Sequence, residues 1–266
     1  MQEGGTPGIF LAGMMVLVLT LYVWFGTVIQ ENMDGLPNAQ VKRSFVWGMG
    51  WFIFSEVMFF AVFFGSLLYV RQLALPWLSE GATSELLWNG FEASWPLMTT
   101  PDQMVNGDAA VMAGPEHNMS FPGWDNIFHW LPLWNTVVLM TSSWTVHIAH
   151  SAIKNNNRAK FNIWLGITVA LGIIFIYLQV LEYHEAYTEM GLTLASGIYG
   201  STFFMLTGFH GFHVAMGTFM LLVQFLRGLK GHFNADDQFG FEAASWYWHF
   251  VDVVWVGLFL FVYVLG

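Results

Sequence analysis

The sequence predicts an all-α fold, a polytopic bundle of transmembrane helices. Three observations lead to this prediction: 56% of the 266 residues are hydrophobic, only 10% are charged, and the apolar residues gather into six long blocks. A soluble domain has about a quarter of its residues charged, whereas a membrane helix needs about 20 mostly apolar residues to cross about 30 Å of hydrocarbon. We therefore interpret residues 1–266 as a single transmembrane domain.

Each of the six blocks has the length of one membrane span. In chain order, the six expected spans cover residues 9–29, 45–70, 131–153, 161–181, 198–226 and 243–265. The first lacks the basic flank and the small-residue cleavage site of a signal peptide, so we expect it to remain as a membrane helix. The second contains one acid, Glu56, and the third contains His147 and His150.

The last three spans differ in their polar content. The fourth has no charged residue, the fifth contains His210 and His213, and the sixth contains His249 and Asp252. Ionisable side chains inside a membrane span are rare and face protein or water, since lipid does not solvate them. These side chains are therefore candidates for a function or for contacts between helices.

The basic residues predict the orientation of the spans. Seven of the eight lie in alternate connections, namely Lys42, Arg43, Lys154, Arg158, Lys160, Arg227 and Lys230. Because basic residues near span ends stay on the cytoplasmic side, residues 30–44 form a short loop facing the cytoplasm or mitochondrial matrix. The long loop 71–130 has one basic residue, Arg71, and seven acids, which predicts an acidic outer face. A solvated loop without further function explains it equally well.

The composition also excludes several classes of function. Without cysteine there is no disulfide, iron–sulfur cluster, thiolate zinc site or thiolate-bridged copper centre. A formal charge of −10 with eight basic residues disfavours nucleic acid as a partner, since duplex binding depends on Lys and Arg. We expect no metal site in this chain.

Glu56 is the candidate functional carboxyl. It lies near the middle of its span with no basic residue within a helical turn, so a carboxyl at this depth is expected to be protonated. One interpretation is a carboxyl that holds a proton or lies beside lipid. The alternative is a neutral acid that hydrogen-bonds to a neighbouring helix.

The final span contains a polar stripe. Glu242, His249 and Asp252 are seven and three residues apart, so they lie on one face of a helix. We expect this stripe to form a helix contact, either within the bundle or with a neighbouring subunit.

The paired histidines and a terminal basic cluster have two interpretations each. Histidines three residues apart could bind metal or haem, but hydrogen bonding across helices explains them more simply. The basic cluster at the end of the fifth span, Arg227, Lys230 and His232, suits anionic lipid head groups, although ordinary cytoplasmic flanking explains it as well.

Several motifs resemble subunit III of haem–copper cytochrome c oxidases of the aa3 type. They are SEVMFF at 55–60, LQVLEY at 178–183, YGSTFF at 199–204, TGFHGFHV at 207–214 and FGFEAASWYWHFVDVVW at 239–255. The resemblance covers nearly the whole chain except the loop 71–130, and the last motif is close to diagnostic.

The resemblance implies a core subunit without haem or copper of its own. In that family, subunit III packs against the catalytic subunit I, with haem and copper held by subunits I and II. It also supports proton uptake during O2 reduction in aerobic respiration, and cytochrome c is the electron donor to the complex. Phospholipid binds in a cleft between a two-helix and a five-helix bundle.

Carried onto this sequence, the resemblance assigns roles to particular residues. Glu56 is the buried acid, His249 belongs to the helix contacts, and the lipid-binding residues are Arg227, Lys230, His232, Trp24 and Glu31. The family usually has seven helices, whereas this chain begins at what resembles the second. The absent first helix accounts for an N-terminus outside and puts the lipid cleft in doubt unless another chain completes it.

The leading hypothesis is thus a non-redox subunit of a proton-pumping oxidase, with no catalytic centre in this chain. We expect it in the plasma membrane of a bacterium, and less so in the mitochondrial inner membrane. Subunit III of a quinol oxidase is the alternative. An unrelated proton-coupled transporter using Glu56 and Asp252 is disfavoured, because the sequence has no internal repeat, and an independent b-type haem protein would need the histidine pairs.

Overall fold

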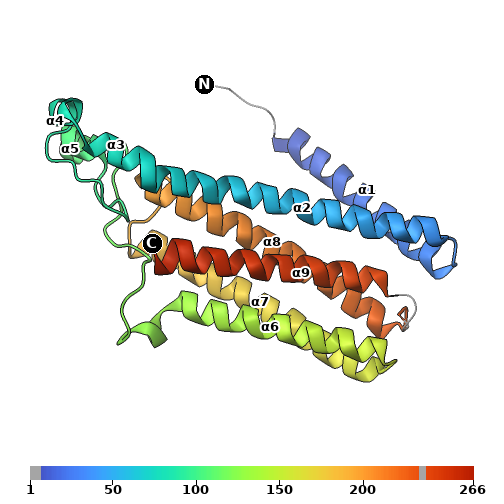
Figure 1. The fold of residues 1–266 in the computed structure, drawn as a ribbon. Helices are drawn as coiled ribbons and strands as arrows, with labels where there is room; N and C mark the ends of the chain where they lie inside the picture. Colours follow the sequence, from blue (N-terminus) through green and yellow to red (C-terminus); the bar gives the residue numbers. More distant parts are fainter. Residues whose placement is uncertain (1–6, 234–237) are drawn as a thin grey trace. The chain divides into compact units, whose positions relative to one another are not determined.

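All regular secondary structure in the described part of the chain is helical. The structure is a computed structural model that describes residues 7–233 and 238–266, and no strand occurs in these ranges. Its six long helices are α1 (Pro7–Met33), α2 (Ala39–Tyr69), α6 (Leu131–Lys154), α7 (Arg158–Thr188), α8 (Gly197–Leu229) and α9 (Phe239–Leu258) (Figure 1). The all-α membrane bundle predicted from the sequence is confirmed.

Among the described residues, five helical segments are both long and apolar enough to cross a membrane. They are Gly8–Met33, Ala39–Ser79, Arg158–Thr188, Gly197–Leu229 and Phe239–Val264. The remaining expected span, α6, has 24 residues but contains many hydroxyl side chains. Several of these donate to carbonyls of the same helix, as Thr141 does to Val137 at 2.6 Å and Ser142 does to Leu139 at 2.6 Å. Such bonds satisfy the hydroxyls inside the membrane, so α6 can span despite its lower mean hydropathy.

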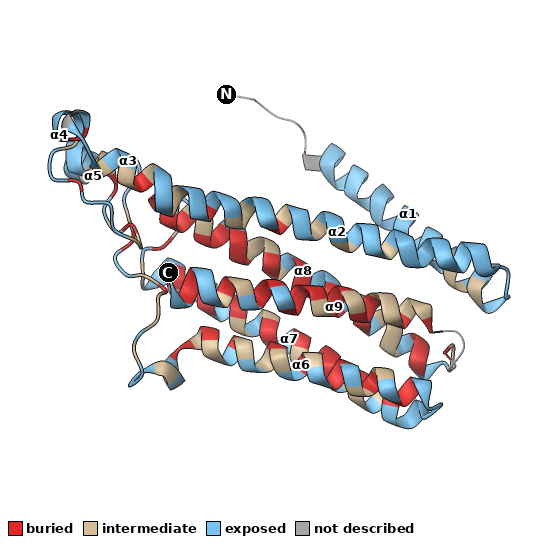
Figure 2. Ribbon diagram, viewed as in Figure 1, coloured by how far each residue is buried: buried red, intermediate tan, exposed pale blue. Residues whose placement is uncertain are grey.

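The chain divides into two compact units, Met1–Trp51 and Phe52–Gly266, which we describe separately. The first contains α1 and the beginning of α2, whose N-terminus is capped by the Asn38 side chain accepting a 3.0 Å bond from the Val41 amide. The side chains of α1 are exposed along the helix (Figure 2). An apolar surface of this extent requires lipid or protein cover.

The second unit is built around α9. Trp248 and Trp255 of α9 are completely buried, and Figure 2 shows buried residues along most of this helix. α9 packs against α6 and α8, and the Trp255 ring lies edge-on to Phe175 of α7 at 4.9 Å. Gly217 of α8 allows this close packing, because a Cβ there would lie 2.8 Å from the Trp248 ring. Small residues at such contacts are the usual means of bringing membrane helices together.

The second half of α2 joins this unit through aromatic side chains. Phe59 lies edge-on to Phe209 of α8 at 5.0 Å between ring centroids, and Phe60 contacts the His213 ring at 5.0 Å. Because large rings fill the space, the backbones stay apart while the side chains pack. This arrangement places the middle of α2, including Glu56, against α8.

Two expected boundaries were wrong. The helix α7 ends at Thr188, so the loop expected from residue 182 begins later. The helix α2 continues through a π-helical turn, Val70–Ala74, into α3 (Leu75–Ser79), so the long acidic segment begins as helix. That segment also contains α4 (Ala82–Leu87) and α5 (Pro101–Asn106).

Within the second unit, the basic and acidic connections lie at opposite ends of the bundle (Figure 1). The turn between α6 and α7 and the end of α8 hold the basic residues, while α4 and α5 lie at the other end. The acidic segment is tied to the bundle by backbone bonds, including the Glu116 amide to the Met190 carbonyl at 2.9 Å and the Phe121 amide to the Tyr263 carbonyl at 3.0 Å. It is therefore an ordered part of the unit.

Candidate functional site

The candidate carboxyl Glu56 pairs with a histidine from another helix. Its Oε2 atom lies 2.9 Å from Nε2 of His213 on α8, and the side chains are 22% and 8% exposed, respectively. The other ring nitrogen of His213, Nδ1, is 2.6 Å from the Phe209 carbonyl oxygen. Since a carbonyl only accepts, Nδ1 carries a proton and Nε2 faces Glu56.

This geometry determines the charge of the Glu56–His213 pair. A bond between Nε2 and Oε2 requires one proton, which is either on the carboxyl or on the imidazole. Both arrangements have zero net charge, so the pair can lie among the rings of Phe59 and Phe60 without leaving an uncompensated charge in hydrocarbon. The pair links α2 to α8 and shares one proton between its two side chains.

The polar stripe of α9 faces α6. Glu242 Oε1 lies 3.1 Å from His150 Nε2, and His249 Nδ1 lies 2.9 Å from the Ser143 hydroxyl. Asp252, with 6% of its side chain exposed, lies 3.5 Å from His249. Glu242 and His249 therefore contact α6, and Asp252 lies beside His249 on α9.

Further bonds join the same two helices. The indole of Trp248 donates to the Ser142 hydroxyl at 3.0 Å, and the indole of Trp255 donates to Thr136 at 2.9 Å. The hydroxyl groups of α6 therefore serve both its own backbone and the buried side chains of α9. Such interhelical bonds are the usual polar contacts of membrane bundles.

The sequence analysis missed a fully buried acid, Glu182 on α7. It accepts a 2.5 Å bond from the Tyr263 hydroxyl and a 3.3 Å bond from the Asn135 side-chain amide of α6. All three side chains are completely buried. Placing a loop at residue 182 hid this site, although Gln179, Glu182 and Ala186 follow helical spacing and lie on one face.

Neither histidine pair converges on a common point. His150 faces Glu242 while His147 is exposed; His213 faces Glu56 while Nε2 of His210 donates to the Val251 carbonyl at 3.2 Å. In residues 7–233 and 238–266, no group of three or more His, Cys, Asp or Glu side chains is placed to hold a metal ion.

The three predicted lipid-binding residues of the basic cluster differ in their surroundings. Arg227 is 9% exposed, donates to Gln224 at 3.0 Å and lies over the Phe233 ring at 4.5 Å. Lys230 is exposed at the end of α8. Desolvation, with the nearby charges of Arg227 and Lys230, lowers the pKa of His232 and so favours its neutral imidazole. Lys230 is thus the exposed cation of the three.

The other two predicted lipid-binding residues, Trp24 and Glu31, belong to the first unit. Both are exposed on α1, seven residues apart and therefore on one stripe of the helix. The Trp24 ring stacks on Phe25 with 5.9 Å between centroids.

Comparison with known proteins identifies the family. The sequence profile described as Cytochrome c oxidase subunit III matches residues 3–83 and 126–266. Cytochrome c oxidase subunit 3 of Drosophila melanogaster is 40% identical over 259 residues, which is 97% of this chain and 84% of the relative. The proteins of the same name from Hippopotamus amphibius and Petromyzon marinus are 38% and 37% identical, over 96% of this chain and 82% of each relative. The chain therefore belongs to the cytochrome c oxidase subunit III family.

Proposed function

We propose that this chain is a non-redox core subunit that stabilises the catalytic subunit I of a proton-pumping oxidase. Subunit I, with subunit II, would hold the haem and copper, and cytochrome c would donate electrons to the complex. The observation that best supports this role is the use of His150, His210, His213 and His249 in bonds between helices. Their nitrogens serve packing, which suits a chain whose chemistry lies in its partners.

We infer that the Glu56–His213 pair supports proton uptake by the complex. It holds one proton within the membrane-spanning segments, and that proton can shift between the two side chains while the net charge of the pair stays zero. Its 22% exposed carboxyl is accessible at the surface of the second unit.

Phospholipid binding is the second part of the proposal. Lys230 supplies an exposed cation beside the end of α8, where anionic head groups are attracted to basic side chains. The exposed apolar surfaces of α1 and α2 suit acyl chains, with Trp24 and Glu31 on α1 as further contacts. Arg227 would act by holding this end of α8 in place.

The membrane that holds the complex is a respiratory one. The relatives described above come from animals. Their origin favours the mitochondrial inner membrane over the plasma membrane of a bacterium, which the sequence alone had favoured. The names of these relatives also favour cytochrome c over quinol as the electron donor.

Purification tests this proposal. A complex isolated through a tag on this chain is expected to contain haem- and copper-bearing subunits and to oxidise cytochrome c. The isolated chain is expected to show no Soret absorption. A haem band in the isolated chain, or a functional chain without any oxidase partner, would contradict the proposal.

A further inference from the structure

A hollow at the acidic end of the second unit lies outside the part of the chain that matches the family profile. The profile stops at residue 83 and resumes at 126; we name the intervening residues 84–125 the cap. The hollow has a volume of about 230 Å³. It is lined by Phe91, Glu92, Ser94, Met98, Thr99 and Met104. The family profile therefore does not cover this site.

The cap holds this hollow in a defined shape. Thr100 and Gln103 form a capping box at the start of α5, and the Gln103 side chain also accepts from the Gly114 amide at 2.8 Å. Asp102 accepts from the backbone amides of Val111 at 2.7 Å and Met112 at 3.0 Å. These bonds fold residues 100–114 onto themselves, so the wall that carries Thr99 and Met104 is preorganised.

The cap is also fastened to the membrane helices. The Met119 amide donates to the Tyr199 hydroxyl of α8 at 3.0 Å, and the Trp95 ring lies edge-on to Tyr199 at 5.6 Å. Arg71 lies over Trp95 at 5.3 Å while its guanidinium donates to carbonyls at the C-terminus, including Phe261 at 3.1 Å. The hollow is thus held on the bundle.

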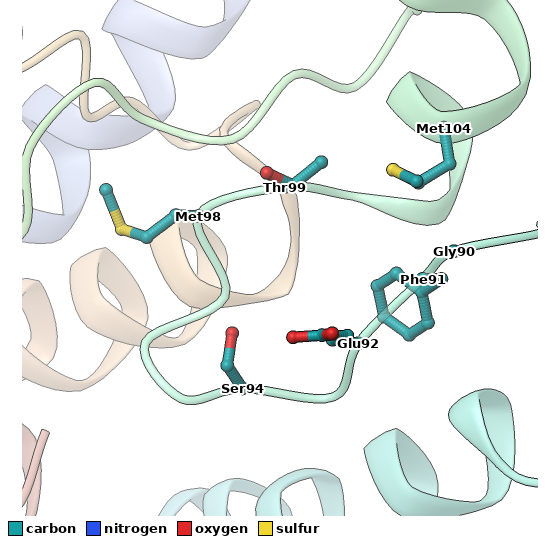
Figure 3. A pocket seen from close by; sticks show the side chains of 7 residues that line it. All are labelled: Gly90, Phe91, Glu92, Ser94, Met98, Thr99 and Met104. Atoms are coloured by element: carbon teal, nitrogen blue, oxygen red, sulfur yellow. The ribbon is translucent and has the colours of Figure 1, made fainter.

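The lining combines one acid with apolar and hydroxyl groups. In Figure 3 the Glu92 carboxylate points toward Ser94, the Phe91 ring lies beside it, and Met98 and Met104 lie on opposite sides. The sequence has no Lys or Arg between residues 72 and 153, and Arg71 is engaged with the C-terminal carbonyls. A Lys or Arg side chain matches this lining, since its stem packs on apolar groups and its head bonds to a carboxylate.

Other features of the cap favour a protein over a small amine. Leu86 and Val111 of the cap are 87% and 88% exposed, and Met112 is 54% exposed. Exposed apolar side chains of the cap add contact area for a protein partner, and the acids of the cap, a segment without Lys or Arg, would attract a basic protein from a distance. A small amine would need neither feature.

We propose that the cap is a docking surface for the basic cytochrome c that donates electrons to the complex, with a Lys or Arg side chain of that protein in the hollow beside Glu92. The identity of the partner rests on the proposed function. The electrons need not pass through this chain, because docking only raises the local concentration of the donor and orients it.

Steady-state oxidation of cytochrome c by the intact complex tests the docking. Glu92→Gln is expected to raise the KM about three- to tenfold at low ionic strength, as loss of one charge-assisted contact does, and to leave kcat unchanged. The effect should fall near physiological salt, where the screening length is about 8 Å. Glu189→Gln is the matched control: it removes one exposed acid at the same end of the unit and should leave KM within about twofold of the parent at low salt.

Two further measurements make the test decisive. Leu86→Ser is expected to raise KM without changing the salt dependence, because it removes apolar contact and no charge. Butylammonium, a small amine of the same chemistry as a lysine side chain, should compete with cytochrome c in the parent but not in Glu92→Gln. If KM is unchanged in both Glu92→Gln and Leu86→Ser, the docking proposal is overturned, whether or not butylammonium binds. Failure of the parent complex to oxidise cytochrome c would instead overturn the proposed function.

Discussion

Replacing the buried acid Glu182 by Leu should destabilise the second unit. The substitution removes the acceptor of two buried donors, the Tyr263 hydroxyl at 2.5 Å and the Asn135 amide at 3.3 Å. Each orphaned donor costs about 1 to 3 kcal/mol in proteins generally, and about 0.6 kcal/mol on average between membrane helices. Two donors therefore give a loss of about 1 to 6 kcal/mol in the free energy of unfolding, with the full burial of all three side chains favouring the upper half.

Glu182→Gln is expected to cost less than about 1 kcal/mol, because an amide can keep both bonds. Its oxygen can accept from Tyr263, and its NH2 group can donate to Asn135 once that amide rotates. The rotation is available because the Asn135 Oδ1 atom has no hydrogen-bond partner in the described structure. Tyr263→Phe should fall between the two Glu182 variants, since it removes one bond.

Reversible unfolding in mixed detergent micelles, followed by circular dichroism, measures these differences. Glu189→Leu serves as the control, since Glu189 is exposed at the end of the same helix and should change stability by less than about 0.5 kcal/mol. The reasoning fails if Glu182→Leu is as stable as the parent, or if Glu182→Gln is as damaging as Glu182→Leu.

Three other predictions follow from local geometry. Glu56→Gln should preserve assembly of the complex, because the Gln amide can donate to the His213 Nε2 atom, whereas Glu56→Leu should reduce the yield of assembled complex. A hydrophobic carbodiimide should label Glu56 in the parent at neutral pH. Absence of labelling would place the shared proton on His213. Gly217→Ala should destabilise by about 1 to 3 kcal/mol through overpacking, because its Cβ would lie 2.8 Å from a buried tryptophan ring, while Gly65→Ala, with nothing within 4 Å, should be neutral or stabilising in the same unfolding assay. Hydrogen bonds from the Met112 amide, the Asn106 side chain and the Val111 amide lower the pKa of Asp102, so the folded cap favours the carboxylate. The stability that this carboxylate gives to the cap is present above about pH 4 and is lost as the pH falls through the lowered pKa. Hydrogen exchange at residues 107–114 should accelerate over that acidic range, and an Asp102→Asn variant should show faster exchange at neutral pH without the acidic step.

Particular residues show where the sequence was sufficient for prediction. The stripe Glu242, His249 and Asp252 was predicted from spacing alone, because residues seven and three apart share a face on any helix. Its facing helix, α6, could not be predicted, since spacing says nothing about which neighbour a face meets. Glu56 was singled out because it is an acid in an apolar span, but its partner His213 lies 157 residues away and no local pattern links them.

Glu182 was missed for a related reason. Beside Glu185 and Glu189 it reads as the polar end of a span, and only the packing of α6 and the C-terminus around it shows that it is buried. The long acidic segment was likewise predicted as a loop, because acids, prolines and glycines dominate it. Its order depends on bonds to residues far along the chain, such as Tyr199 and Tyr263.

The amino-acid sequence by itself determined the helical, membrane-spanning character of this protein and its subunit III family, because apolar length and local motifs are properties of contiguous residues. Only the tertiary structure decided which polar groups pair. Hydrogen bonds between helices depend on how the helices rotate and approach, so the neutral Glu56–His213 pair, the buried Glu182 cluster and the hollow beside Glu92 arise from packing across distant segments.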